Sequence, residues 1–232
     1  MLYFWAVPAS FGLCSALFLL LSLFGGFRVE PSCSRVSAFH HFVAMLLGMW
    51  VHWEYRERMG TETAVFGANS DFPHAVLLQH FNLGYFLYDT VHVVVWDQKF
   101  LVHHLVAIAG YASSEVANVF GLANAVNTWI TELGSLMYSA YLVFRTDRFY
   151  VGFVLFYTVT RVYFALWSAD VVRHAINALQ GKSLLTYPFW APYCSMGLQL
   201  ALLVVNLLFL ATHWRKLWRR YIRGEATKER QD

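Results

Sequence analysis

The sequence contains little charge. Only 13% of its 232 residues are Asp, Glu, Lys or Arg, about half of the share found in soluble domains. This shortage argues against a soluble globular protein. Cysteine is also scarce, and Cys14, Cys33 and Cys194 have neither the paired spacing of a disulfide framework nor that of a zinc site. We find no internal repeat and no low-complexity tract, so we expect a single domain.

The N-terminal apolar run has no basic residues before it. Residues 3–27 contain no charged residue, so we expect neither a signal peptide nor an Arg-rich transit peptide, and the run is predicted to be a retained helix. The short alternating segments typical of a membrane β-barrel are also missing. These absences leave a helical membrane protein as the main interpretation.

Long apolar runs dominate the sequence, which is 58% hydrophobic. Runs close to 20 residues long are typical of transmembrane helices. The sequence therefore predicts an all-α polytopic protein with about seven transmembrane helices. The predicted spans are residues 3–27, 36–53, 72–96, 100–114, 117–144, 149–173 and 188–212, with loops at 28–35 and 54–71.

We divide the chain into a membrane bundle, residues 1–212, and a basic tail, residues 213–232. With seven spans, twelve Lys and Arg fall on the side of the tail and four on the other side. Positive residues favour the cytoplasmic face, so the C-terminus is expected in the cytosol or the mitochondrial matrix. Aromatic residues alternate with basic ones in the tail, which is typical of either an interfacial helix or a solvated helix end.

The stretch from Asn82 to Gly110 carries ionisable groups inside apolar sequence. Tyr85, Asp89 and His92 are spaced to share one helix face. After the polar turn 97–99 come His103 and His104. His92 and His104 lie six residues on either side of Gln98, so a hairpin places them at equal depth beside Asp89. Adjacent helical residues point about 100° apart, so one of the two histidines is expected to face Asp89.

Two further ionisable residues, Glu132 and Arg161, lie inside later predicted spans. Charged groups in a membrane interior need partners, so we expect them to pair with each other or with the hairpin residues. Asn127 and Thr131 share a face with Glu132 and are candidates for a cavity lining or for contacts between helices.

Three interpretations of these polar residues remain open: a pocket for a lipid head group or acyl chain, an Asp–His pair that sets the register of two helices, and a metal site. We assign no metal, because the histidines do not form repeated metal-binding boxes. The candidate catalytic residues are His103, His104 and Asp89. The candidate lipid-binding residues are Tyr85, Tyr88, His92, Asn127, Thr131, Glu132 and Arg161.

Four segments resemble, in order and spacing, the TLC-domain family. They read GYFLYD, FLVHHLVAIAGY, ITELGSLMYSAYLVF and VTRVYF, and the resemblance covers about residues 40–212. It implies a bundle of six or more helices around a lipid-accessible tunnel. It also implies that His103 and His104 are the family's histidine pair, that Tyr88 and Asp89 are its Tyr-Asp motif, and that one histidine acts as a general base or accepts an acyl group.

The ceramide synthases of this family transfer an acyl group from coenzyme A to a sphingoid amine. The second acidic motif of those enzymes is missing here, so the chain is closer to the smaller TLC-domain proteins, which are associated with membrane lipid composition. We expect a protein that binds or acts on a lipid or fatty-acyl chain. The alternatives are a non-catalytic accessory subunit of a membrane complex and a ceramide-synthase-like N-acyltransferase.

The expected partners are membrane lipids and, in the second interpretation, other membrane subunits, with no nucleic acid. No tightly bound cofactor is expected, and acyl-CoA is the candidate co-substrate. The expected location is the endoplasmic reticulum, with the mitochondrial inner membrane as the alternative.

Overall fold

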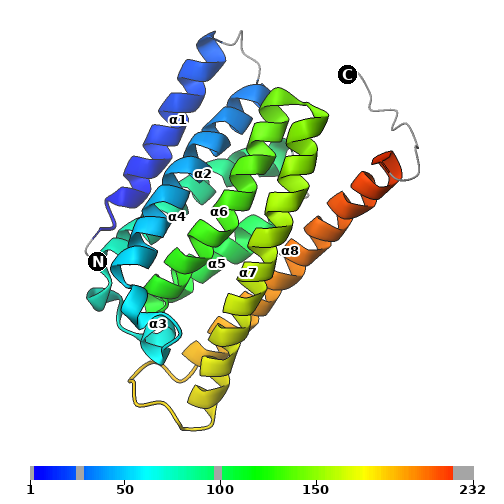
Figure 1. Ribbon diagram of the computed structural model, residues 1–232. Coiled ribbons are helices and arrows are strands. Elements are labelled where there is room, and N and C mark those ends of the chain that lie inside the picture. Colours follow the sequence, from blue (N-terminus) through cyan, green and yellow to red (C-terminus); the bar gives the residue numbers. More distant parts are fainter. Residues whose placement is uncertain (1–2, 25–28, 97–100, 222–232) are drawn as a thin grey trace.

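The computed structural model describes residues 3–24, 29–96 and 101–221, and within these ranges the chain forms helices and no strands. The predicted all-α class is therefore confirmed. The helices, seen in Figure 1, are α1 (Ala6–Phe24), α2 (Val29–Glu54), α3 (Glu62–Phe66), α4 (Pro73–Trp96), α5 (Leu101–Ala117), α6 (Gly121–Phe144), α7 (Asp147–Leu179) and α8 (Ala191–Tyr221), with short 3-10 helices η1 (Arg56–Arg58) and η2 (Asn69–Asp71).

The start of α2 and the end of α8 differ from the ends of the predicted spans. The stretch 28–35 was predicted as a loop, but α2 begins at Val29. Pro31 falls in the first turn of this helix, where a backbone N–H has no acceptor within the helix, so proline is tolerated there. The seventh span was predicted to end near residue 212, and α8 continues as a helix to Tyr221, as both interpretations of the basic tail allow. Its basic and aromatic residues recur at helical spacing, which extends the helix beyond the apolar run.

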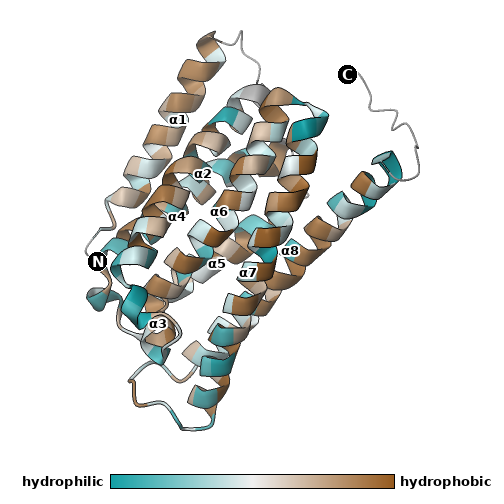
Figure 2. Cartoon of the chain, viewed as in Figure 1, coloured by the Kyte–Doolittle hydropathy of each residue, from teal (hydrophilic) through white to brown (hydrophobic). Residues whose placement is uncertain are grey.

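Three helices, α1, α7 and α8, are long and apolar enough to cross a membrane among the residues described. The expected number of about seven spans is not confirmed. Helices α2, α4 and α6 have 26, 24 and 24 residues, which is long enough for a span. Buried polar side chains occur on these helices, as His40, Asn82 and Thr128 do, and also on α7 and α8. Figure 2 shows polar and apolar residues interspersed along the bundle.

Helix α6 is central in the bundle. It packs against α2 and α7, and also contacts α4 and α5, while α8 lies against α5 and α7 (Figure 1). Helix α1 packs on the outside of α4, where the Ser10 hydroxyl donates a hydrogen bond to the carbonyl oxygen of Phe81 at 2.7 Å. Gly84 makes this approach possible, because a Cβ atom there would lie 2.3 Å from the carbonyl oxygen of Val7.

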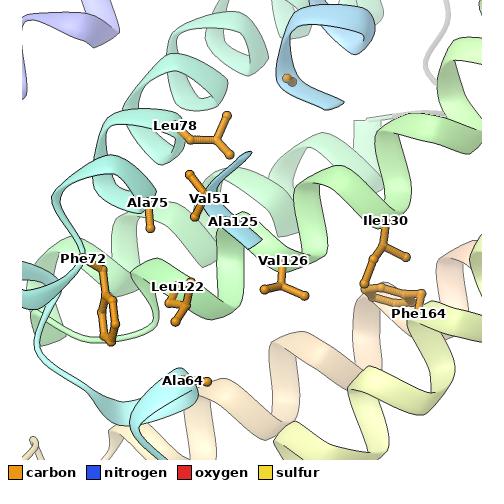
Figure 3. Packing of buried hydrophobic residues seen from close by; sticks show 11 residues of the cluster. Val51, Ala64, Phe72, Ala75, Leu78, Leu122, Ala125, Val126, Ile130 and Phe164 are labelled. Atoms are coloured by element: carbon orange, nitrogen blue, oxygen red, sulfur yellow. The ribbon is translucent and has the colours of Figure 1, made fainter. Parts of the chain in front are cut away.

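The largest cluster of buried apolar residues lies in the half of the bundle where α4 and α6 begin. Figure 3 shows Leu78 of α4, Val126 and Ile130 of α6 and Phe164 of α7 packed together with further buried residues from α2 and α3. These side chains come mainly from the C-terminal half of α2 and the N-terminal halves of α4 and α6. The other half, where α8 ends, holds smaller apolar clusters, one from α1, α2, α4 and α5 and one from α6, α7 and α8.

Candidate functional site

A cavity of about 1130 Å³ lies inside this second half of the bundle. It is lined by residues of α2, α4, α5, α6, α7 and α8. Because neighbouring helices run in opposite directions, the C-terminal half of α4 and the N-terminal part of α5 meet at the same end, together with the last turns of α8. The cavity therefore extends from the middle of the bundle to the end marked by Lys216.

Nine of the ten predicted site residues line this cavity: Tyr85, Asp89, His92, His103, His104, Asn127, Thr131, Glu132 and Arg161. Tyr88 does not. Its ring packs against Phe11 and Phe18 of α1 and against His92, so it contributes to the contact between α1 and α4 instead.

A contact between Asp89 and one of the two histidines was predicted across the hairpin, and the structure forms it with His104. His104 Nε2 lies 2.9 Å from Asp89 Oδ2, and both side chains are largely buried. The ring of His103 points elsewhere, with its edge toward Phe86, and also lines the cavity. The prediction that only one of the two histidines faces Asp89 is therefore confirmed. The turn predicted at residues 97–99 lies outside the described residues.

Glu132 has a partner that the sequence analysis did not name. Its Oε2 atom bonds Nδ1 of His41, which lies on α2, so the predicted pairing with Arg161 or with the hairpin is wrong. His40 and His41 stand out in the sequence as adjacent histidines in a predicted span. The sequence alone could not predict that His41 bonds Glu132, because α2 and α6 are far apart along the chain.

Arg161 is buried and bonded only to neutral groups. Its Nε atom donates to Asn206 Oδ1 at 2.8 Å, and its Nη1 atom donates to the Thr131 carbonyl oxygen at 3.2 Å. The guanidinium carbon lies 3.8 Å from the centre of the Tyr157 ring. Within the part of the chain that the structure describes, no carboxylate bonds this guanidinium.

Two of the predicted lipid-binding residues use their polar atoms within the bundle. The Asn127 and Gln199 amides bond each other in both directions, at 3.0 and 3.2 Å, which connects α6 to α8. The Thr131 hydroxyl donates to the Asn127 carbonyl oxygen at 2.8 Å. These groups therefore shape the wall of the cavity and already have hydrogen-bond partners.

One group of side chains could hold a metal ion. Donor atoms of His40, His41 and Glu132 lie within 4.8 Å of one another, and imidazole with carboxylate suits divalent transition metals. His40 is fully buried and stacks on Tyr85 with the ring centres 3.6 Å apart. Among the described residues its two ring nitrogens have no hydrogen-bond partner. The expectation that no metal binds tightly stays a prediction.

The arrangement brings two kinds of chemistry to one cavity. The pairs Asp89–His104 and Glu132–His41 are carboxylate–imidazole contacts, and these groups commonly accept and donate protons in acid–base chemistry. Arg161 can bind an anionic group. Both lie beside apolar side chains from α5 and α8, including Val106, Leu202 and Phe209.

Comparison with known proteins gives one match. A family model described as the TLC domain matches residues 32–215. This range runs from the first turn of α2 into α8 and includes all the cavity-lining residues except Lys216. Neither the curated proteins nor the solved structures contain a match to the chain.

Proposed function

Because the chain belongs to the TLC-domain family, and is therefore an integral membrane protein of lipid biology, we propose that it binds the acyl chain of a lipid in the cavity between its helices. In this proposal the protein acts on the bound lipid or presents it, and so influences membrane lipid composition. The lipid comes from the surrounding membrane, and no nucleic acid takes part.

The observation that carries this proposal is the cavity itself. Its volume of about 1130 Å³ exceeds the roughly 300–1,000 Å³ of ordinary small-molecule sites. Aliphatic and aromatic side chains make up much of its wall, and ionisable residues also line it. A long hydrocarbon with a polar head is the ligand whose chemistry matches both kinds of side chain.

We also propose a location for the protein and an orientation in the membrane. We propose the endoplasmic reticulum, with the mitochondrial inner membrane as the alternative. The excess of Lys and Arg near the C-terminus supports a cytosolic or matrix position for that end. The cavity extends toward the same end, because α8 contributes Lys216 from one of its last turns.

Filling the cavity tests the proposal. Gly110 lines the cavity, and a Cβ atom added there meets nothing within 4 Å, so Gly110→Leu places a side chain in the space without a clash at Cβ. Gly12 is the matched control, since it is also helical and open, but lies on α1 away from the cavity. Both variants and the wild type are purified in mild detergent, and the lipids that remain bound are extracted and quantified by mass spectrometry.

We expect the wild type and Gly12→Leu to retain a defined lipid class in near-stoichiometric amount, and Gly110→Leu to retain several-fold less at equal thermal stability. Equal retention by all three proteins, or a non-selective mixture of detergent-shell lipids, would overturn the proposal. That result would favour the accessory-subunit interpretation, in which the bundle serves mainly as a surface for other membrane proteins.

Acyl transfer is the second candidate function, favoured by the orientation of His104. Asp89 bonds His104, as the acidic partner of a general base often does, and His103 lies beside it on the cavity wall. Acyl-CoA would be the co-substrate, as in the ceramide synthases, and no tightly bound cofactor is needed. The missing second acidic motif makes simple lipid binding the leading proposal.

A further inference from the structure

We infer that the ligand carries a negatively charged head group, a carboxylate or a phosphate, and that Arg161 binds this group inside the cavity. The inference rests on the proposed function and deepens it, because it selects anionic acyl lipids over neutral ones. It names a recognition residue on α7, outside the hairpin that carries the histidine pair.

The Arg161 guanidinium is a buried charge that bonds no carboxylate among the described residues. Arg161 is only 3% exposed, and arginine stays protonated at all accessible pH values. A buried charge is costly unless an opposite charge accompanies it. Within the described ranges of the chain, every recorded partner of Arg161 is neutral: Asn206, Thr131 and Thr160. A ligand anion would supply the missing charge.

The other charged groups that line the cavity are either paired with a histidine or exposed near the end of α8. The carboxylates of Asp89 and Glu132 each bond an imidazole, His104 and His41 respectively. Lys216 lines the cavity near the end of α8 but is exposed. Arg161 is therefore the buried cation available to an anionic ligand among the cavity-lining residues described.

The Arg161 guanidinium is held in place by its neighbours and still has N–H groups without an acceptor among the described residues. Asn206 Oδ1 accepts from Arg161 Nε and also from the Tyr157 hydroxyl at 3.0 Å, and the Tyr157 ring covers one guanidinium face. The Nη2 atom carries two N–H groups that have no acceptor among the residues described. A rigid guanidinium with unused donors suits the geometry of carboxylate or phosphate.

Helix α6 also leaves room for this group. A Cβ atom at Gly134 would lie 2.7 Å from Thr160 Oγ1 and 3.2 Å from Arg161 Nη1. A larger residue at this position would therefore press on the guanidinium, and glycine allows α7 to bring Arg161 against the Thr131 carbonyl. The position of Arg161 thus depends on contacts from α6, α7 and α8 together.

Three probes with the same hydrocarbon chain test the inference on purified, delipidated protein in detergent. They are oleic acid, 1-oleoyl lysophosphatidic acid and oleyl alcohol, measured at mildly alkaline pH so that the fatty acid is ionised. We expect wild type to bind at least one of the two anions about tenfold or more tightly than the alcohol, as expected of hydrogen bonds to charged groups. The preferred anion distinguishes a free fatty acid from a phospholipid head group.

Arg161→Gln should bind the alcohol as the wild type does and lose the preference for the anion. Lys216→Gln is the control, because it removes a cation from the same cavity at its exposed end, and it should keep the preference. If Arg161→Gln does not fold, the wild-type comparison of the three probes still decides whether an anion is preferred, and Arg161→Lys keeps the charge while removing the planar guanidinium.

Equal affinity of the wild type for anions and alcohol would overturn the inference while leaving the proposed function intact. The inference also fails if Arg161→Gln keeps the preference, or if Lys216→Gln abolishes it. Failure to bind any of the three probes, the neutral alcohol included, would instead count against the proposed function.

Discussion

At the scale of single residues, two carboxylate–histidine pairs in this protein differ in their surroundings. Asp89 and His104 meet at 2.9 Å inside the cavity, with side chains 14% and 7% exposed. Glu54 and His74 meet at the same distance near the ends of α2 and α4, and their side chains are 31% and 38% exposed. Similar geometry should therefore give different energies, because water screens the second pair.

Replacing Asp89 by Asn is expected to lower the free energy of unfolding by about 1–3 kcal/mol, the usual cost of disturbing a buried charged hydrogen bond. Glu54→Gln is the matched control, for which a change within about 1 kcal/mol is expected. Thermal unfolding of the purified proteins in one detergent, followed by tryptophan fluorescence, measures both. Equal melting temperatures for the two variants would contradict the structural role given to Asp89.

The sequence predicted that Asp89 meets His103 or His104, because a short turn brings the helix of Asp89 beside the helix of the two histidines at similar depth. It could not predict the His41–Glu132 contact. That pair depends on α2 lying beside α6, and the intervening helices α4 and α5 can be arranged in several ways with the same local patterns. Tyr88 was a candidate lipid-binding residue but packs against α1 instead of lining the cavity. The sequence of α4 does not show which helix packs against the face that carries Tyr88.

At the scale of a helix, α5 presents two consecutive histidines in different directions. His104 is buried and bonded to Asp89. His103 lies at the cavity wall, and no hydrogen bond to it is recorded within the described residues. Successive residues of a helix point about 100° apart. The imidazole of His104 is therefore held by Asp89, while that of His103 points in another direction on the cavity wall. This difference divides their expected roles.

If the protein transfers acyl groups, we expect His103→Ala to reduce turnover by about 100-fold or more without lowering the melting temperature. His104→Ala should reduce turnover and also lower stability, because it leaves the Asp89 carboxylate without its partner. Acyl turnover with purified protein and acyl-CoA, measured alongside thermal unfolding, separates the two effects. Unchanged turnover in both variants would remove acyl transfer as a candidate function.

Helix positions were well predicted where apolar runs have clear ends, as for α4 and α6. The prediction of helix limits failed where a charged residue was taken to mark a loop. Arg35 lies in the stretch predicted as a loop but is inside α2, whereas the basic residues after Thr212 were expected to be helical and are so as far as Tyr221. Charge marks the limit of an apolar environment, whereas a helix ends only where its backbone hydrogen bonding ends.

At the scale of the whole molecule, the large cavity lies toward one end of the bundle and the largest apolar cluster toward the other. The apolar cluster of α2, α4, α6 and α7 closes one half, while six helices surround the cavity in the other. The resemblance to the TLC-domain family implied a tunnel, but the sequence could not show which helices line it. The contribution of α8, through residues such as Asn206 and His213, follows only from the three-dimensional packing.

The central claim, that an acyl chain occupies this cavity, is tested most directly by photo-crosslinking. Protein in membranes is incubated with a fatty acid that carries a diazirine in its chain, irradiated and digested, and the adducts are located by mass spectrometry. We predict adducts on cavity-lining residues of α5 and α8, such as Val106, Leu202 and Phe209, and their loss in Gly110→Leu. Adducts confined to outward-facing residues such as Leu19 and Leu166, and unaffected by Gly110→Leu, would contradict it.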